Sequence, residues 1–196
     1  MKAYIQDIEY YLPPNILSNE DLNSQNPEWN IEKISELTGI NTRHIVSTET
    51  SLDLGESAAK KLFKKNTELT EKIDYLIFCS QSPDYFLPTS ACILQDKLGL
   101  NIGIGAIDVN QGCSGFVYSL GLAKGLIESN QCLNVLIITS ETYSKFINPK
   151  DKSVRTLFGD GACAILVSSK ETPEIGILPV IHGTDGSGYD QLIVPH

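Results

Sequence analysis

The sequence lacks the cysteine patterns that indicate a metal site or a disulfide framework. Its cysteines form no C-x-x-C pair and show no metal-ligand spacing, and their odd number would leave one unpaired. They are Cys79, Cys92, Cys113, Cys132 and Cys163. We therefore expect free thiols in a reducing compartment, with no metal and no other cofactor.

Signals for export and for membrane insertion are also missing. No apolar run approaches the ~20 residues that a membrane-spanning helix needs. The first residues, Met1-Lys-Ala-Tyr4, begin a strand-like pattern rather than a signal peptide. We expect a cytoplasmic protein that does not enter a membrane.

Positive charge is scarce. The chain carries 15 Lys and Arg against 24 Asp and Glu, a net charge of -9, which disfavours nucleic acid or an anionic membrane as the main partner. Its 196 residues, 41% hydrophobic and 20% charged, are ordinary for a globular protein. Since it has no internal repeat and no low-complexity linker, we expect a single domain over residues 1–196.

Histidine, the usual proton carrier of an enzyme site, occurs three times. His44 lies in an extended segment, His182 ends an expected strand, and His196 is the last residue. A cysteine nucleophile that also moves protons usually needs a positioned histidine. Each histidine is better explained as structural or exposed, although His182 stays open as a partner.

Apolar runs alternate with helical patterns along the chain. Strands are expected over residues 3–11, 73–79, 106–109, 135–139, 163–168 and 175–182. Helices are expected over 52–65, 88–98 and 113–129, with shorter ones starting at Ser18 and near Pro27. Asp21 would complete the Ser18 cap and Gly39 would end the second short helix. This alternation indicates an α/β fold with a mixed but largely parallel sheet.

The stretch around Cys113 carries the clearest chemistry. Ala106 to Val109 reads as a buried strand, a polar turn follows, and an uncharged helical pattern then runs to Lys124. The first amides of a helix have no intrahelical partner and carry the positive end of its dipole, which favours a thiolate and an oxyanion. Position alone leaves a nucleophile and a small buried hydrophobic residue about equally favoured.

Two glycine motifs are weaker signals. Gly103-Ile-Gly105 resembles the start of a dinucleotide fingerprint, but Asp108 occupies the place of its third glycine and a strand follows. Phe158-Gly-Asp-Gly-Ala162 reads as a tight turn before a strand, with Asp160 bonding local amides. Its functional alternative is a wall of a site near Cys113. Residues 140–155 read as a polar surface excursion.

Taken in order, these motifs resemble the ketoacyl-ACP synthase III family of thiolase-fold condensing enzymes. The resemblance covers essentially the whole chain and rests on two central motifs, Gln111-Gly-Cys-Ser-Gly-Phe-Val-Tyr118 and Leu157-Phe-Gly-Asp-Gly-Ala162. Four more segments agree: Thr38-Gly-Ile-x-x-Arg-His44, Leu87-Pro-Thr-Ser-Ala-Cys92, Leu98-Gly99 and Gly183-Thr-Asp-Gly-Ser-Gly188.

The resemblance implies a thiolase-like fold made of two βαβαβαββ halves, each centred on a buried helix. Cys113 would be the nucleophile that takes an acyl group from acyl-CoA or acyl-ACP, with its own amide as an oxyanion donor. Malonyl-ACP would then lose carbon dioxide and attack the thioester, giving a 3-oxoacyl-ACP. Acyl carrier protein would be a partner, and the enzyme would be a homodimer.

The resemblance also assigns substrate-binding positions. Leu87 would reach into the acyl pocket of the dimer partner, and Phe158 would lie near the nucleophile. Trp29 lies in the region of the family's adenine-stacking tryptophan, and Lys152 occupies the position of an arginine. Because lysine cannot stack or form a bidentate fork as arginine does, a CoA primer is less secure than an acyl-ACP primer.

The family's histidine and asparagine lie in the second half of its members, so the chain resembles an N-terminal half only. We expect such a chain to be inactive in condensation by itself. Two alternatives stay open. One is an acyltransferase or a secondary-metabolite synthase that uses the same cysteine; the other is a non-catalytic half-domain that dimerises.

Overall fold

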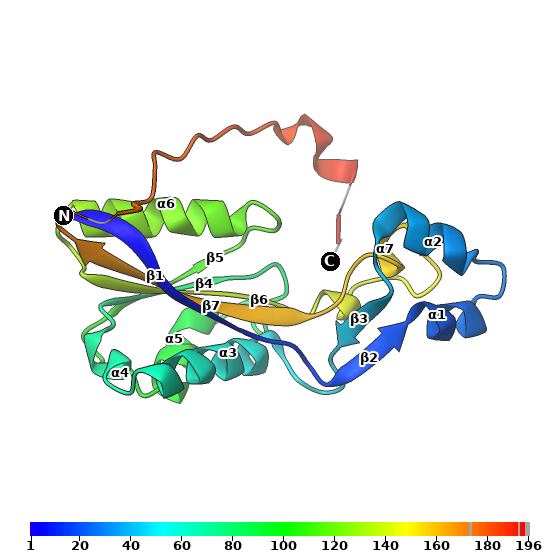
Figure 1. Cartoon of the computed structure of the whole chain (residues 1–196), viewed down its shortest axis with the longest axis horizontal. Helices are drawn as coiled ribbons and strands as arrows, with labels where there is room; N and C mark the ends of the chain where they lie inside the picture. The colour runs from blue at the N-terminus through cyan, green and yellow to red at the C-terminus, as the bar shows by residue number, and fades with distance from the viewer. Residues whose placement is uncertain (173, 192, 195–196) are drawn as a thin grey trace.

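The computed structural model describes residues 1–172, 174–191 and 193–194. It contains a five-stranded sheet with helices on both faces and a separate two-stranded ribbon (Figure 1). The strands are β1 (Lys2–Tyr11), β2 (Asn15–Ser18), β3 (Thr42–Ile45), β4 (Tyr75–Cys79), β5 (Gly105–Val109), β6 (Asn134–Glu141) and β7 (Gly161–Lys170). The helices are α1 (Asn19–Gln25), α2 (Ile31–Thr38), α3 (Ser51–Lys65), α4 (Leu69–Lys72), α5 (Ser90–Lys97), α6 (Gly115–Glu128), α7 (Lys152–Arg155) and the 3-10 helices η1 (Tyr143–Lys145) and η2 (Gly186–Gln191).

The large sheet is mixed, with the strand order β1-β7-β6-β4-β5. β4 runs parallel to β5 and β6, whereas β7 runs antiparallel to both β6 and β1. The predicted α/β class is confirmed, but the prediction of a largely parallel sheet is wrong. The segment from β6 to β7 holds only the short helices η1 and α7, so no crossover helix brings β7 back in parallel.

The strands of the large sheet and the helices α3, α5 and α6 follow the order β1-α3-β4-α5-β5-α6-β6-β7. This is the βαβαβαββ alternation that the resemblance implies. Several predicted helix ends are confirmed as well. Ser18 and Asp21 form a capping box at α1, and Gly39 ends α2 with a φ of 69°, which a residue with a side chain rarely adopts.

Side chains alternate between the two faces along the central strands. Leu136 and Ile138 of β6 join the core under α3 and α5, whereas Val135 and Ile137 join the core under α6. Figure 1 shows α3, α4 and α5 on one side of the sheet and α6 alone on the other. The first face is therefore covered by several helices and the second by one.

The prediction that α6 is a buried helix holds for one side of it only. The inward stripe Gly115, Ser119, Ala123 and Ile127 is buried against the sheet. On the outward side, Val117 is 46% exposed and Leu122 is 44% exposed. Apolar side chains of α6 thus face solvent, beside the ion pair of Lys124 and Glu128.

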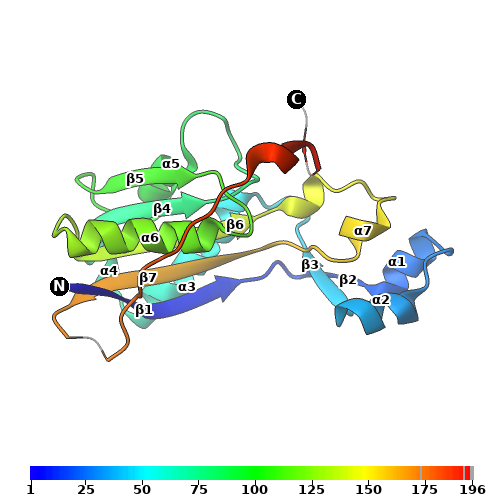
Figure 2. The ribbon, with the colours of Figure 1, turned by 90° about the horizontal axis from the view of Figure 1, so that it is seen from above.

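The predicted strand over residues 175–182 is wrong. Ile177 N–H donates to the Ala3 carbonyl at the edge of β1, but the chain then passes over α6 instead of pairing along β1 (Figures 1 and 2). Leu178 and Ile181 are left 79% and 94% exposed. An apolar pattern predicts a strand only where a partner edge continues alongside it.

Within the described residues, none of the helices combines the length and the apolar character needed to cross a membrane.

Candidate active site

Cys113 is exposed at the passage from β5 to α6, two residues before the first residue of the helix. The Gly115 N–H donates to the Gly112 carbonyl at 2.8 Å, which closes a turn around Cys113, and Tyr118 N–H then bonds Ser114 O at 3.1 Å. In the part of the chain that the structure describes, the Cys113 N–H has no acceptor. The predicted placement is confirmed, and it leaves both the thiol and an amide donor open to a ligand.

The glycines on each side of Cys113 lie close against two side chains, the exposed Gln81 and the buried Cys79. A Cβ at Gly112 would overlap the side chain of Gln81, and a Cβ at Gly115 would overlap the Sγ of Cys79. Both neighbours belong to β4 or to the loop that follows it. Cys79 Sγ also lies 3.5 Å from the Gln111 carbonyl oxygen. The nucleophile turn therefore rests directly on the carboxyl end of the neighbouring parallel strand.

A partly buried carboxylate lies behind this support. Glu141, the last residue of β6, accepts a hydrogen bond from Gln81 N–H at 2.8 Å and another from the Ser82 hydroxyl at 2.7 Å. Burial raises the pKa of Glu141, and the nearby carboxylate of Asp160 acts in the same direction. The sequence gives no signal for a role of Glu141, because a single acid after an apolar strand reads as the start of a loop.

The prediction that residues 140–155 lie on the surface is wrong for the first of these residues. Ser140 and Thr142 are 1% and 3% exposed. The Ser140 hydroxyl donates to the Ser51 carbonyl at 2.6 Å, and Thr142 N–H donates to Ser82 Oγ at 2.9 Å. These long-range bonds bury a polar segment that a local pattern presents as exposed.

The Gly-Asp-Gly turn ties separate segments together. The Asp160 carboxylate accepts from Val46 N–H at 2.8 Å and from Ser144 N–H at 2.9 Å, and its own N–H donates to His44 O at 2.7 Å. The prediction that Asp160 bonds local amides is therefore wrong, because these partners lie far from it along the chain. Phe158, 37% exposed, packs edge-on against Tyr143 with ring centroids 5.1 Å apart; its position near the nucleophile stays a prediction.

The other predicted binding residues lie in different surroundings. Leu87 is 84% exposed in the loop between β4 and α5, and Lys152 is exposed at the start of α7. Trp29 is 5% exposed and packs with Leu22 and Ile34, so its ring faces are occupied by protein side chains rather than presented for stacking. The structure brings none of these three into hydrogen-bond contact with the Cys113 turn.

Neither of the two described histidines, His44 and His182, is hydrogen-bonded to Cys113. His44 Nδ1 lies 2.6 Å from the Pro13 carbonyl oxygen, a structural contact. His182 is exposed over α6, with its ring 4.7 Å from that of Tyr118. His182, Tyr118 and Gln111 line one open groove of about 540 Å³ beside α6. His196 lies outside the described residues.

The fold and the cysteine turn place the chain in a class of proteins, the family of thiolase-fold condensing enzymes. The family model described as 3-oxoacyl-[acyl-carrier-protein] synthase III matches residues 107–186, a range that includes the Cys113 and Asp160 turns. The chain is 40% identical to the beta-ketoacyl-[acyl-carrier-protein] synthase III of Sulfurovum sp., over 98% of this chain and 57% of that protein. Its counterpart from Clostridium perfringens is 41% identical, over 94% of this chain and 56% of that protein.

Solved structures agree with the sequence relatives. A crystal structure of a 3-oxoacyl-(acyl-carrier-protein) synthase III is 48% identical with a TM-score of 0.95, over 98% of this chain and 58% of that one. The enzyme of Pseudomonas aeruginosa PAO1 is 31% identical with a TM-score of 0.90, over 100% of this chain and 59% of that one.

The chain belongs to the ketoacyl-ACP synthase III family and corresponds to the N-terminal half of its relatives. It spans 56–58% of the length of the curated relatives that it matches.

Proposed function

We propose that this chain carries the acyl-accepting half of a 3-oxoacyl-ACP synthase III, with Cys113 as the nucleophile. The observation that carries the proposal is the exposed thiol at the start of α6, beside an amide without an acceptor in the described residues. The thiolate attacks the carbonyl carbon of an acyl thioester, and the CoA or carrier-protein thiolate leaves. The Cys113 amide stabilises the oxyanion of the tetrahedral intermediate.

In the proposed second step, malonyl-ACP loses carbon dioxide and its carbanion attacks the acyl-Cys113 thioester. The carbon–carbon bond forms as the Cys113 thiolate leaves, and the product is a 3-oxoacyl-ACP. Stabilising that carbanion needs groups beyond the Cys113 turn, since His44 is bonded to the Pro13 carbonyl and the His182 ring packs beside Tyr118 in the groove along α6. The chain by itself is therefore expected to accept an acyl group but not to condense it.

Partners and further binding residues follow from the same proposal. Acyl carrier protein would deliver the thioester, Phe158 would border the acyl group, and Lys152 would meet the phosphates of CoA or its carrier equivalent. Leu87, exposed in its loop, would enter the acyl pocket of a second copy in a homodimer. Trp29 would have to leave its packed position to stack on adenine, so its burial counts against that role.

Incubation with acyl-CoA followed by peptide mass spectrometry tests the nucleophile. We expect an acyl group on Cys113 in the native chain and none in Cys113→Ala. The exposed Cys92 serves as a matched control, since Cys92→Ala should leave the modification in place. An acyl group found on Cys92 instead of Cys113, in both the native chain and Cys113→Ala, would overturn the proposal.

One similarity supports a second candidate. The chain is 27% identical, with a TM-score of 0.88, to the priming beta-ketosynthase from the R1128 polyketide biosynthetic pathway. A polyketide or other secondary-metabolite role would use the same Cys113 thioester but a different acyl donor or acceptor. A panel of acyl-CoA chain lengths in the mass-spectrometric experiment separates the two candidates.

A non-catalytic dimerising half-domain is the third candidate. The apolar residues exposed on the loop after β4, Tyr85 and Leu87, and on the outer side of α6 support an association surface. Light scattering distinguishes it, since a dimer that never takes up an acyl group fits this candidate alone.

A further inference from the structure

The turn that holds Cys113 packs against side chains at the carboxyl end of β4 that the proposed reaction does not use. Cys79 and Gln81 are two positions apart along the end of β4. Their side chains meet the two glycines of the turn, Cys79 at Gly115 and Gln81 at Gly112. Because neither glycine has a Cβ, the backbone of the turn packs directly onto these two side chains.

The position of Gln81 is in turn fixed by Glu141. The two carboxylate oxygens accept from consecutive residues, one from Gln81 N–H at 2.8 Å and the other from the Ser82 hydroxyl at 2.7 Å. The Ser82 oxygen also accepts from Thr142 N–H at 2.9 Å, which returns the network to the chain just after Glu141. A carboxylate is the side chain that can accept both bonds at once.

We infer that Glu141 and Gln81 are positioning residues for the nucleophile, acting through Gly112 to hold the Cys113 turn. This inference rests on the proposed role of Cys113. Neither residue is given a contact with substrate; Glu141 holds the Gln81 backbone, and the Gln81 side chain packs on Gly112. Loss of either one should loosen the turn while β4, β6 and α6 stay in place.

The test is the rate at which iodoacetamide alkylates Cys113 relative to Cys92, measured by peptide mass spectrometry. Cys92 is an exposed thiol on α5 and reports any general change in the protein or the reagent. Glu141→Gln keeps the size of the side chain but replaces one acceptor oxygen by a donor. We expect the Cys113:Cys92 ratio to change about fivefold, since even a fraction of the energy of a charged hydrogen bond has that effect. Gln81→Ala should change the ratio in the same direction.

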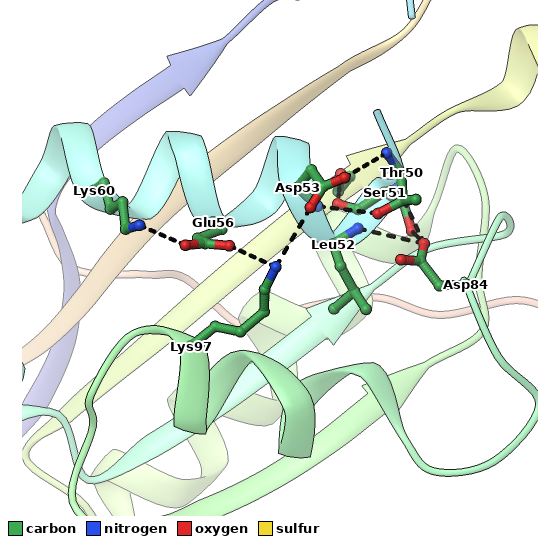
Figure 3. A network of polar contacts seen from close by, with 9 residues as sticks. Thr50, Ser51, Leu52, Asp53, Glu56, Lys60, Asp84 and Lys97 are labelled. Carbon is green, nitrogen blue, oxygen red and sulfur yellow. Dashed lines mark hydrogen bonds and ion pairs between the residues drawn. The ribbon is translucent and has the colours of Figure 1, made fainter. Parts of the chain in front are cut away.

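Asp84→Asn is the matched control. Asp84 lies in the same loop after β4, and its carboxylate accepts from Ser51 N–H at 3.1 Å and from the Ser51 hydroxyl at 2.9 Å, at the start of α3 (Figure 3). Asp84→Asn removes a carboxylate charge from this loop but keeps the oxygen that accepts these bonds, and Asp84 is not joined to the Cys113 turn. Its Cys113:Cys92 ratio should stay within twofold of the native value.

A pH series gives a second readout. Besides burial, the Asp160 carboxylate raises the pKa of Glu141, whereas the hydrogen bonds from Gln81 and Ser82 lower it. Burial and the charge of Glu141 in turn raise the pKa of the Cys79 thiol. Acidification that protonates Glu141 should shift the native Cys113:Cys92 ratio toward that of Glu141→Gln, whose own ratio should show no such step.

Two results would overturn the inference: an unchanged ratio in Glu141→Gln, or an equal change in Asp84→Asn. Alkylation needs no acyl donor, so these outcomes are separate from failure of the proposed function. If Cys113 takes no acyl group but the ratios change as expected, the turn is positioned by Glu141 and the proposed function fails.

Discussion

The two faces of the five-stranded sheet are covered to different extents. On one face α3 and α5 pack closely, and α3 alone buries eight residues, Ser51, Leu52, Leu54, Gly55, Ala58, Ala59, Leu62 and Phe63. On the other face α6 buries a single stripe and leaves Val117 and Leu122 nearly half exposed. Cys113 lies at the start of this less covered helix. The first face therefore contributes most of the packing that stabilises the fold. The helix on the second face begins next to the proposed nucleophile and leaves apolar side chains exposed.

The largest expected effect compares one leucine from each face. Leu94 of α5 is fully buried, and Leu94→Ala should lower the free energy of unfolding by about 2–5 kcal/mol. Leu122 of α6 is 44% exposed, and Leu122→Ala should lower it by less than about 0.5 kcal/mol. Urea denaturation measures both. Equal losses would contradict the assignment of the two faces.

The second prediction tests the close packing beneath the nucleophile. Gly115→Ala places a methyl group against Cys79 Sγ and should cost about 1–3 kcal/mol of stability, with slower acylation of Cys113. Removing the sulfur should relieve the overlap, so Gly115→Ala combined with Cys79→Ala should be more stable than the sum of the single effects predicts. Strict additivity of the two substitutions in thermal unfolding would show that the contact is absent.

A smaller effect is expected from the ion pairs on the two faces. Lys97 of α5 joins Glu56 at 2.8 Å and Asp53 at 3.4 Å on α3, linking two helices (Figure 3). Lys97→Met should reduce stability by about 0.2–1 kcal/mol, and the loss should shrink at high salt. Lys124→Met on α6 breaks a pair with Glu128 within one helix and serves as the comparison. A larger loss for Lys124→Met would contradict the view that the first face carries the stability.

The smallest expected effect is a pH dependence at Glu141. Burial raises the pKa of this carboxyl, so the folded state binds its proton more tightly than the unfolded state. Its contribution to stability is therefore present below the unfolded pKa and is lost as the pH rises through the folded value. Urea denaturation of the native chain and Glu141→Gln at several pH values should show the native chain losing stability relative to the variant as the pH increases. A constant difference would show that Glu141 titrates alike in both states.

Short sequence patterns predict the helix ends and the Cys113 turn correctly. Ser18 with Asp21 and Gly39 identified helix ends, because a cap is decided by a few neighbouring residues. The turn at Cys113 was found in the same way, from an apolar strand, a polar turn and an uncharged helix. The family resemblance rested on such motifs and is confirmed by the relatives.

Long-range pairing accounts for what the sequence did not predict. Residues 175–182 have a strand pattern but pair with β1 only at Ile177 among the described residues. The direction of β7 depends on the absence of a crossover helix after β6, and the burial of Glu141 depends on donors about 60 positions away at Gln81 and Ser82. No short window of sequence contains these partners.

The most direct test of the account is the site of acylation in the native chain. After incubation with acyl-CoA, peptide mass spectrometry should place the acyl group on Cys113, at the start of the open-face helix, and leave Cys92 on α5 unmodified. Hydroxylamine should release the group, as expected for a thioester. Equal modification of Cys113 and Cys92, or none on Cys113, would contradict the central claim that the α6 turn holds the reacting thiol.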